Sequence, residues 1–246
     1  MKRTKLILLL AVLGIGFLMT SCLDEGSRDY TETSVSYIAV DNTTGIKYAR
    51  TLTGKFIISN EMLQMQPGTF KFFTYSWNEE NGTTPIGDTQ ADNVHISGDP
   101  VDIKRTTLQM TEPPAQEENV SFVAFDPPYY VNNREYLGDH WLFQYAYEAK
   151  KGETAVIDFY RMDDTEAVGN NVKVGIQLTI TGEPDAGSSV TTRSDIIALN
   201  MAPLRAMYEG ASQTNTKDLQ ITFQYYLKGR QEPIDSQIYR LTVAGD

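Results

Sequence analysis

The chain is poor in the residues on which thiol chemistry, metal sites and nucleic-acid binding depend. It has one cysteine and two histidines in 246 residues. A single thiol cannot form a disulfide within the chain, and a cysteine-rich zinc site needs several thiolates. Lys and Arg number 21 against 32 Asp and Glu, and the basic residues do not cluster. Because phosphate binding needs a clustered basic surface, this balance disfavours nucleic acid as a partner.

Long hydrophobic runs are also missing. The longest apolar run covers the 14 residues 6–19, whereas a membrane-spanning helix needs about 20. A basic tip precedes this run, and two small residues and then Cys22 follow it. This order predicts a lipoprotein signal peptide over residues 1–21 and lipid attachment to Cys22. The expected location is therefore the outer membrane through a lipid anchor, at the cell surface or, as the alternative, on the periplasmic face.

The residues after Cys22 are polar. Removing the signal peptide with its three basic residues changes the formal net charge from −11 to −14. Residues 22–33 have too little apolar content to pack and predict a flexible tether. The tether begins with two acidic residues, Asp24 and Glu25, as in surface-exported lipoproteins, which favours the cell surface over the periplasm.

Beyond the tether, the hydrophobic pattern is that of β-strands. Apolar and polar residues alternate over 172–180, which predicts a strand with one buried face. The same alternation occurs over 141–147, 219–225 and 239–243. Shorter strands are expected near 34–40, 55–58, 69–77, 120–125, 155–162 and 195–201. Only 202–211 has helical spacing, with Pro203 at its start. The fold class predicted is all-β.

A stretch rich in proline and acidic residues, between positions 99 and 119, interrupts this pattern. We therefore expect a small N-terminal OB-like β-barrel over 34–111 and a C-terminal antiparallel β-sandwich over 119–246. The alternative is one larger sandwich with a long crossing connection.

The chain resembles the NigD-like lipoproteins. The resemblance rests on TSCLDE at 20–25, GDHWLFQYAYE at 138–148, IIALNMAPL at 196–204, LQITFQYYLKG at 219–229 and IYRLTV at 238–243. It implies a lipidated N-terminus, a small N-terminal barrel of the OB type, a C-terminal β-sandwich, and a place in the cell envelope without an assigned reaction.

No catalytic motif follows Cys22. His95 and His140 do not accompany a Gly-x-Ser-x-Gly elbow, and the glycines stand singly at turns. The sequence therefore predicts no catalytic residue, no metal site and no cofactor, and His140 is interpreted as a strand-end residue.

Two carboxylates would suffice for a glycosidase; the acidic candidates are Asp126, Asp158, Asp163, Asp164 and Glu166. Residues 163–171 also offer oxygen ligands of the kind that Ca²⁺ takes, but without the spacing of a known calcium loop, so a solvated turn is the preferred interpretation.

The most suggestive cluster is aromatic. Residues 125–136 place Tyr129, Tyr130 and Tyr136 in one loop beside Asn, Asp and Arg. Aromatic faces next to hydrogen-bonding groups suit sugar rings or protein partners. Trp77, close to the Asn81-Gly82 turn, is a candidate for a second such surface. The competing interpretation is that these rings cover the ends of a sandwich.

Two function hypotheses follow. The first is a non-catalytic envelope lipoprotein, not an enzyme, that binds or scaffolds a surface glycan or protein complex. The second is a lipid-anchored glycoside hydrolase that uses two carboxylates. A secreted inhibitor or immunity factor is also compatible with the sequence. The oligomeric state, the ligand and the partner are left open.

Overall fold

Strands form nearly all the regular structure of the chain, as the alternating pattern predicts. The computed structural model describes residues 29–114, 120–162, 170–209 and 215–245. By its internal contacts the chain divides into two units, 1–102 and 103–246. The predicted Cys22 anchor, its signal peptide and most of the tether lie outside the described residues. Among the described residues, no helix is both long and apolar enough to cross a membrane.

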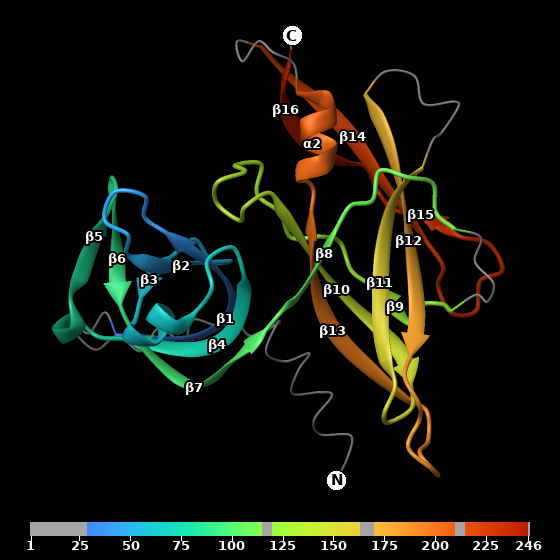
Figure 1. Ribbon diagram of the computed structural model, residues 1–246, viewed down its shortest axis with the longest axis horizontal. Helices are drawn as coiled ribbons and strands as arrows, with labels where there is room; N and C mark the ends of the chain where they lie inside the picture. Colours follow the sequence, from blue (N-terminus) through green and yellow to red (C-terminus); the bar gives the residue numbers. More distant parts are fainter. Residues whose placement is uncertain (1–28, 115–119, 163–169, 210–214, 246) are drawn as a thin grey trace, which may run out of the picture. The chain divides into compact units, whose positions relative to one another are not determined.

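One seven-stranded sheet forms the first unit (Figure 1). Its elements are β1 (Tyr30–Val40), β2 (Lys47–Thr51), β3 (Phe56–Ile58), η2 (Asn60–Gln64), β4 (Phe70–Trp77), η3 (Glu79–Asn81), β5 (Thr83–Ile86), β6 (Thr89–Asn93) and β7 (His95–Asp102). The order across the sheet is β5-β6-β3-β2-β1-β4-β7. The sheet curls, and Met62 of η2 is fully buried in its core beside Ile38 and Tyr75.

This sheet is not a closed barrel in the described part of the chain, because no pairing joins its outer strands β5 and β7. Each outer strand carries a proline, Pro85 or Pro100, which has no N–H to donate to a further strand. The β4–β7 pairing also shifts register between Phe72 and Thr74. The OB-like character of this unit therefore remains a prediction.

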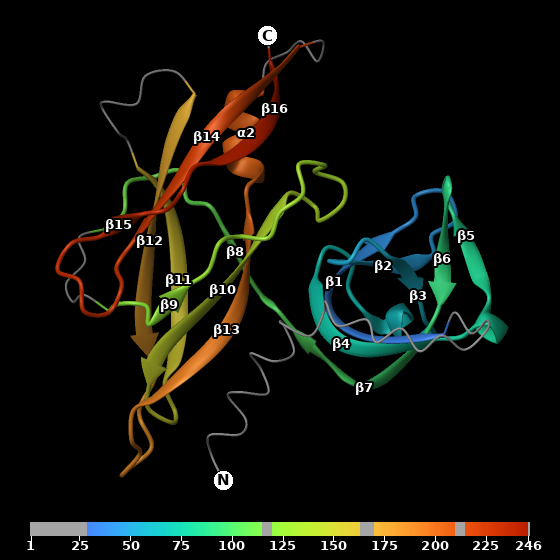
Figure 2. The ribbon, with the colours of Figure 1, turned by 180° about the vertical axis from the view of Figure 1, so that it is seen from behind.

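Two stacked sheets form the second unit (Figure 2). Its elements are β8 (Lys104–Thr107), β9 (Ala124–Phe125), β10 (His140–Ala149), β11 (Thr154–Met162), β12 (Asn171–Thr181), β13 (Thr191–Asn200), α2 (Ala202–Tyr208), β14 (Asn215–Tyr225), β15 (Ile234–Asp235) and β16 (Tyr239–Gly245). One sheet has the order β8-β13-β10-β9, and the other has β11-β12-β14-β15 with β16 also on β14. The predicted alternation decides which faces meet: Val174, Phe223 and Phe143 are at most 1% exposed between the sheets.

The sandwich is not wholly antiparallel. Strands β12 and β14 are parallel neighbours, because β13 between them in the sequence crosses to the other sheet. Strand β8 also pairs with β13 in parallel. The sequence did not predict these two pairings. The predicted short helix is present as α2, with Pro203 in its first turn.

Both sides of the sandwich are spanned by segments that bond to the two sheets. On one side, β8 pairs with β13, and the next residues reach β11, where Gln109 accepts from Arg161 N and donates to Phe159 O at 2.7 and 2.8 Å. On the other side, Phe122 bonds to Tyr226 and Lys228, whereas Val123 donates to Ala146. The predicted N-terminal range 34–111 included β8 and the buried Leu108, which both belong to the second unit.

Candidate functional site

The aromatic loop predicted over 125–136 joins β9 to β10, and its first half is fixed by backbone bonds to β10. Asp126 N donates to Gln144 O at 2.9 Å. Tyr129 and Leu142 exchange two bonds of 2.9 Å each. Because these bonds run along β10 like those of an extra strand, residues 126–129 are held in an extended path.

Tyr130 is a packing residue. Its ring stacks on Trp141 at a centroid distance of 4.0 Å and meets Tyr239 edge-on at 6.2 Å. Its hydroxyl accepts from Arg240 N at 3.4 Å. Trp141 is only 2% exposed, so this stack covers the core, as the competing interpretation proposed.

The other two tyrosines of the loop are more accessible. Tyr129 is 40% exposed, and partial burial raises the pKa of its hydroxyl. Tyr136 is half-buried in the turn where its N–H donates to Asn133 O at 3.1 Å. Since Tyr129 and Tyr130 are successive residues of an extended segment, their rings point to opposite sides.

Trp77 belongs to the first unit, at the end of β4. Its ring stacks on Tyr30 at 5.7 Å, and its indole Nε1 donates to Gly82 O at 2.9 Å. The Tyr30 hydroxyl donates to Asp92 at 2.6 Å, and the Lys55 ammonium lies 3.2 Å from the Tyr30 ring centroid. Burial, and then the Asp92 carboxylate, raise the pKa of Tyr30. The half-buried Trp77 therefore fastens the turn at Gly82 to the sheet.

The strongest candidate site in the second unit is an open cleft beside the aromatic loop, with a volume of about 260 Å³. Its lining comes from both sheets: Phe125, Asp126, Pro127, Pro128, Phe143, Phe223, Tyr225, Asp235, Ser236, Gln237 and Tyr239. Phe143, Phe223 and Tyr239 are buried and form the floor. Phe125 and Tyr225, half-buried at a centroid distance of 4.8 Å, form the walls.

Two exposed carboxylates stand at the rim of this cleft. Asp235 is ion-paired with Lys173 at 3.1 Å and accepts from Gln224 Nε2 at 3.0 Å. Asp126, in contrast, forms no ion pair within the described residues. Burial raises the pKa of Tyr225, and electrostatic interaction with Tyr239 and Asp126 adds to this effect. The cleft thus combines aromatic faces with one unpaired acceptor group.

Of the predicted aromatic loop, only residues 125–128 line the cleft, and Tyr129, Tyr130 and Tyr136 do not. Sequence reasoning missed Tyr225, Gln237 and Tyr239, which lie about a hundred positions further along the chain. They meet the loop because β15 pairs with the end of β14, where Gln224 faces Asp235. The alternation over 219–225 places Tyr225 on the inner face of β14, but nothing in the sequence shows which loop it faces.

A buried ion pair supports the far end of the aromatic loop. Arg205 of α2 donates from Nε and Nη2 to the two carboxylate oxygens of Asp139, at 2.7 and 2.8 Å. Its Nη1 donates to Thr242 O at 2.7 Å. Asp139 is the one non-glycine residue with a positive φ, 63°, in the described chain. Burial acts to lower the pKa of Arg205, but Asp139 and Glu209 outweigh it and raise that pKa.

Those residues considered for catalysis or metal binding that the structure describes form no recognisable centre. His140 closes the loop with Nδ1 3.0 Å from Leu137 O, and burial lowers its pKa. Asp158 accepts from Gln109 Nε2 at 3.3 Å. Asp163, Asp164 and Glu166, with the proposed calcium turn, lie outside the described residues. Within the described ranges, no group of three or more His, Cys, Asp or Glu side chains is placed to hold a metal ion.

Comparisons with known proteins give a fold but no assigned activity. No family model and no curated protein matches the chain. Among solved structures, a protein of unknown function, DUF1344, from Bacteroides vulgatus has a TM-score of 0.57 at 9% identity over 85% of this chain and 90% of its own. A "Putative lipoprotein" from Bacteroides fragilis has a TM-score of 0.57 at 12% identity over 88% of this chain and 99% of its own.

A NigD-like immunity protein from Bacteroides caccae is also similar, with a TM-score of 0.49 at 11% identity over 86% of this chain and 96% of its own. The loose resemblance to NigD-like proteins rests on the sequence segments quoted above. At these identities the likeness extends to the fold alone.

Proposed function

We propose that this chain is a non-catalytic lipoprotein of the cell envelope that binds a surface glycan or protein. The cysteine that follows a signal-like segment supports the envelope address. A protein of the same fold from Bacteroides fragilis is described as a "Putative lipoprotein", which agrees with that address. Anchoring in the outer membrane with the folded units at the cell surface is part of the proposal.

The observation that carries the binding role is the aromatic cleft of the second unit. Its walls and floor offer ring faces, and its rim offers carboxylate and amide groups. Such a combination suits a ligand with both an apolar face and hydroxyl groups. Neither His95 nor His140 lines the cleft.

Binding is tested with the soluble mature chain in two assays, retention of membrane components and a glycan array. The proposal expects a saturable, reproducible partner or glycan in at least one of them. If both assays return nothing, the binding role is wrong.

The proposed membrane anchoring is tested by substituting Cys22→Ala in cells. The variant is expected to lose lipid labelling and to leave the membrane fraction. Continued lipid labelling would overturn the anchor at Cys22. Protease treatment of intact cells then separates the surface from the periplasmic face, because only a surface protein is digested.

A carboxylate-based glycoside hydrolase is the second candidate, and one observation favours it. Asp126 and Asp235 line the same aromatic cleft, as a pair of catalytic carboxylates would. Asp235, however, is held by Lys173 and Gln224. Release of reducing sugar by the native chain, abolished by Asp126→Asn, would replace binding by hydrolysis as the function.

A further inference from the structure

We propose that the cleft between β9 and β15 binds one uncharged pyranose ring, with Asp126 accepting hydrogen bonds from its hydroxyl groups. This inference rests on the proposed binding function and names the ligand class. It places the recognition residues at 125–128, 225 and 235–239, and not at the tyrosines that stand out in the sequence.

The size of the cleft limits its occupant. Pockets for drug-sized ligands measure about 300–1,000 Å³, whereas this cleft measures about 260 Å³. The cleft is open to solvent, so a single ring can enter while the remainder of a longer chain stays in solvent. A terminal or side-chain sugar of a glycan fits this description.

The aromatic rings of the cleft are fixed before a ligand arrives. Phe125 lies 4.8 Å from Tyr225 and 5.3 Å from Phe143 between ring centroids. Phe223 lies 5.8 Å from Tyr239. Because each ring already packs against another, little side-chain freedom is lost when a sugar's C–H face covers the walls.

Polar groups of the rim stand on both sheets. Asp126 follows β9, and Gln237 follows β15; both side chains belong to exposed residues. The hydroxyl of Ser236, another lining residue, already bonds to the backbone, since its Oγ accepts from Phe223 N at 3.0 Å and donates to Gln237 O at 2.7 Å. The side chain of Gln237 hydrogen-bonds to Tyr239, so Asp126 is the one of these two exposed side chains that is left to meet sugar hydroxyls.

The charges at the rim of the cleft favour an uncharged sugar over a charged one. The rim has two carboxylates and, through Lys173, one ammonium at 3.1 Å from Asp235. The remaining negative charge of Asp126 repels uronic and sialic acids. The ammonium also weakens the attraction for a cationic peptide side chain, while Asp126 keeps its capacity to accept hydrogen bonds. An uncharged ring is thus the occupant that this rim favours.

The test titrates the full mature chain, in soluble form, with oligosaccharides of neutral hexoses and N-acetylhexosamines, with uronic-acid oligomers and with an arginine-rich peptide. At least one neutral oligosaccharide is expected to bind and the uronic-acid series is not. Asp126→Asn and Tyr225→Leu are each expected to weaken that binding about tenfold or more. Thermal unfolding of both variants verifies that they fold.

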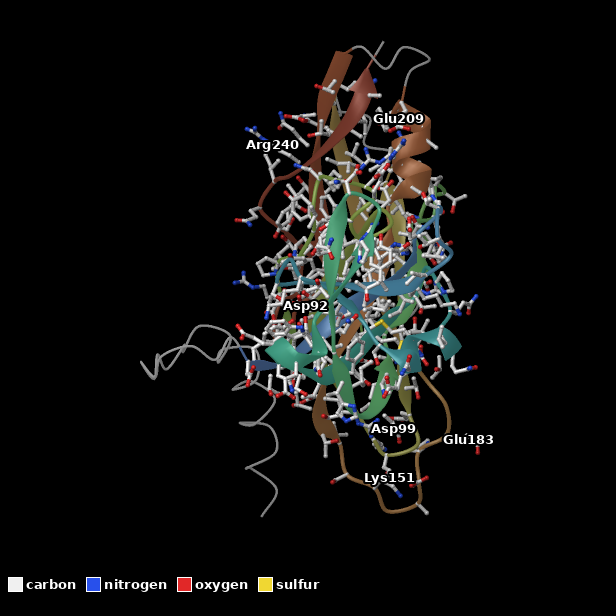
Figure 3. All side chains as sticks on the ribbon, turned by 90° about the vertical axis from the view of Figure 1, so that its left-hand side faces the viewer. Asp92, Asp99, Lys151, Glu183, Glu209 and Arg240 are labelled. Carbon is white, nitrogen blue, oxygen red and sulfur yellow. The ribbon has the colours of Figure 1, made fainter. Side chains whose placement is uncertain are left out.

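Glu183→Gln is the matched control, because it removes one negative charge from an exposed residue away from the cleft. Figure 3 shows Glu183 and Lys151 at one end of the second unit, and Glu209 and Arg240 at the other. Binding by this variant is expected to equal that of the native chain.

Several outcomes would overturn the sugar site. They are a preference for uronic acids, displacement of the sugar by the arginine-rich peptide, or neutral-sugar binding that Asp126→Asn leaves unchanged. If no sugar binds while the membrane assay still retains a specific partner, the sugar site is wrong and the binding function stands. If the membrane assay also retains no partner, the sugar site and the binding function are both wrong.

Discussion

Asp139 and Arg205 form a buried ion pair in the second unit. The Arg205 side chain is 7% exposed and that of Asp139 is 11% exposed. Two charges so far from water are tolerable only when each hydrogen-bonds the other and its remaining groups find partners. Arg205 meets this condition through Thr242 O and Glu209. The pair ties the aromatic loop to α2 and β16.

Arg205→Ala is therefore expected to destabilise the chain by about 3–5 kcal/mol, because it leaves the Asp139 carboxylate buried without a counter-charge. Arg134→Ala is the control, since its pair with Glu209 spans 3.6 Å and the Arg134 side chain is 57% exposed. That substitution is expected to cost at most about 1 kcal/mol. Urea unfolding measures both, and equal losses would contradict the role assigned to the buried pair.

His140 gives the stability of the second unit a pH dependence. Burial lowers the pKa of its ring in the folded chain, although bonds to the backbone of Leu137 and Gly138 act in the opposite direction. An unfolded histidine titrates near 6.5, so the unfolded state takes up its proton first as the pH falls. Stability is thus expected to fall from about pH 7 downward, through the interval between the two pKa values.

His140→Gln removes this titrating group. Its free energy of unfolding is expected to fall less than that of the native chain between pH 7 and pH 5. An identical slope in both proteins would show that His140 does not contribute to the pH dependence.

At the scale of elements, the β10–β11 turn and the β12–β13 turn are in close contact at the end of the sandwich, at Gly152. Gly152, between β10 and β11, has φ = +94° and lies against residues of the β12–β13 turn. A Cβ on Gly152 would overlap the carbonyl oxygen of Glu183 and approach Asp185 N to 3.0 Å. Gly187, in the facing turn, also has a positive φ, +73°, but has open space around it.

Gly187→Ala is expected to cost about 1 kcal/mol through backbone strain alone. Gly152→Ala is expected to cost about 1–3 kcal/mol more, because the backbone of the facing turn must also move. Chemical denaturation compares the two variants. A smaller loss for Gly152→Ala would show that the two turns are not packed as described.

The elements that the sequence predicted well are those whose pattern is decided by one buried face. Strand β12 is predicted because its apolar residues repeat every second position and point into the core. Strand β8, with the sequence KRTT, has no such repeat and forms through its pairing with β13. The β-propensity of these four residues alone does not predict strand β8, because its pairing partner is nearly a hundred residues away.

The candidate site was predictable in part for a similar reason. Composition identified the aromatic loop, but a ring that fills a core and a ring that lines a cleft have the same sequence signature. The ring of Tyr130 packs on the core residue Trp141, whereas the ring of Phe125, in the same loop, lines the cleft. Only the register that sets β15 against the end of β14 decides which rings and carboxylates meet.

For the whole molecule, the residues at the start of the second unit, from 103 onward, pack into that unit and do not form a linker. Leu108 is 2% exposed in the core of the second unit, and Gln109 bonds to β11. A chain of residues 103–246 is therefore expected to fold cooperatively. A chain of residues 119–246, the range predicted from the sequence, lacks β8 and Leu108 and is expected to be less stable.

Leu108→Ala tests the same point without truncation and is expected to cost about 2–5 kcal/mol. Urea unfolding of the two shortened chains and of this variant measures the differences. Equal stability of 103–246 and 119–246 would show that the segment before residue 119 is a linker after all.

Under the proposed function, the chain binds a sugar in the cleft and leaves it intact. The most direct measurement adds a bound neutral oligosaccharide to the isotopically labelled mature chain, follows the amide resonances, and analyses the sugar from the same sample. The predicted result is shifts concentrated at Asp126, Tyr225 and Gln237, with the oligosaccharide unchanged. Shifts elsewhere with none at these residues, or a cleaved oligosaccharide, would contradict it.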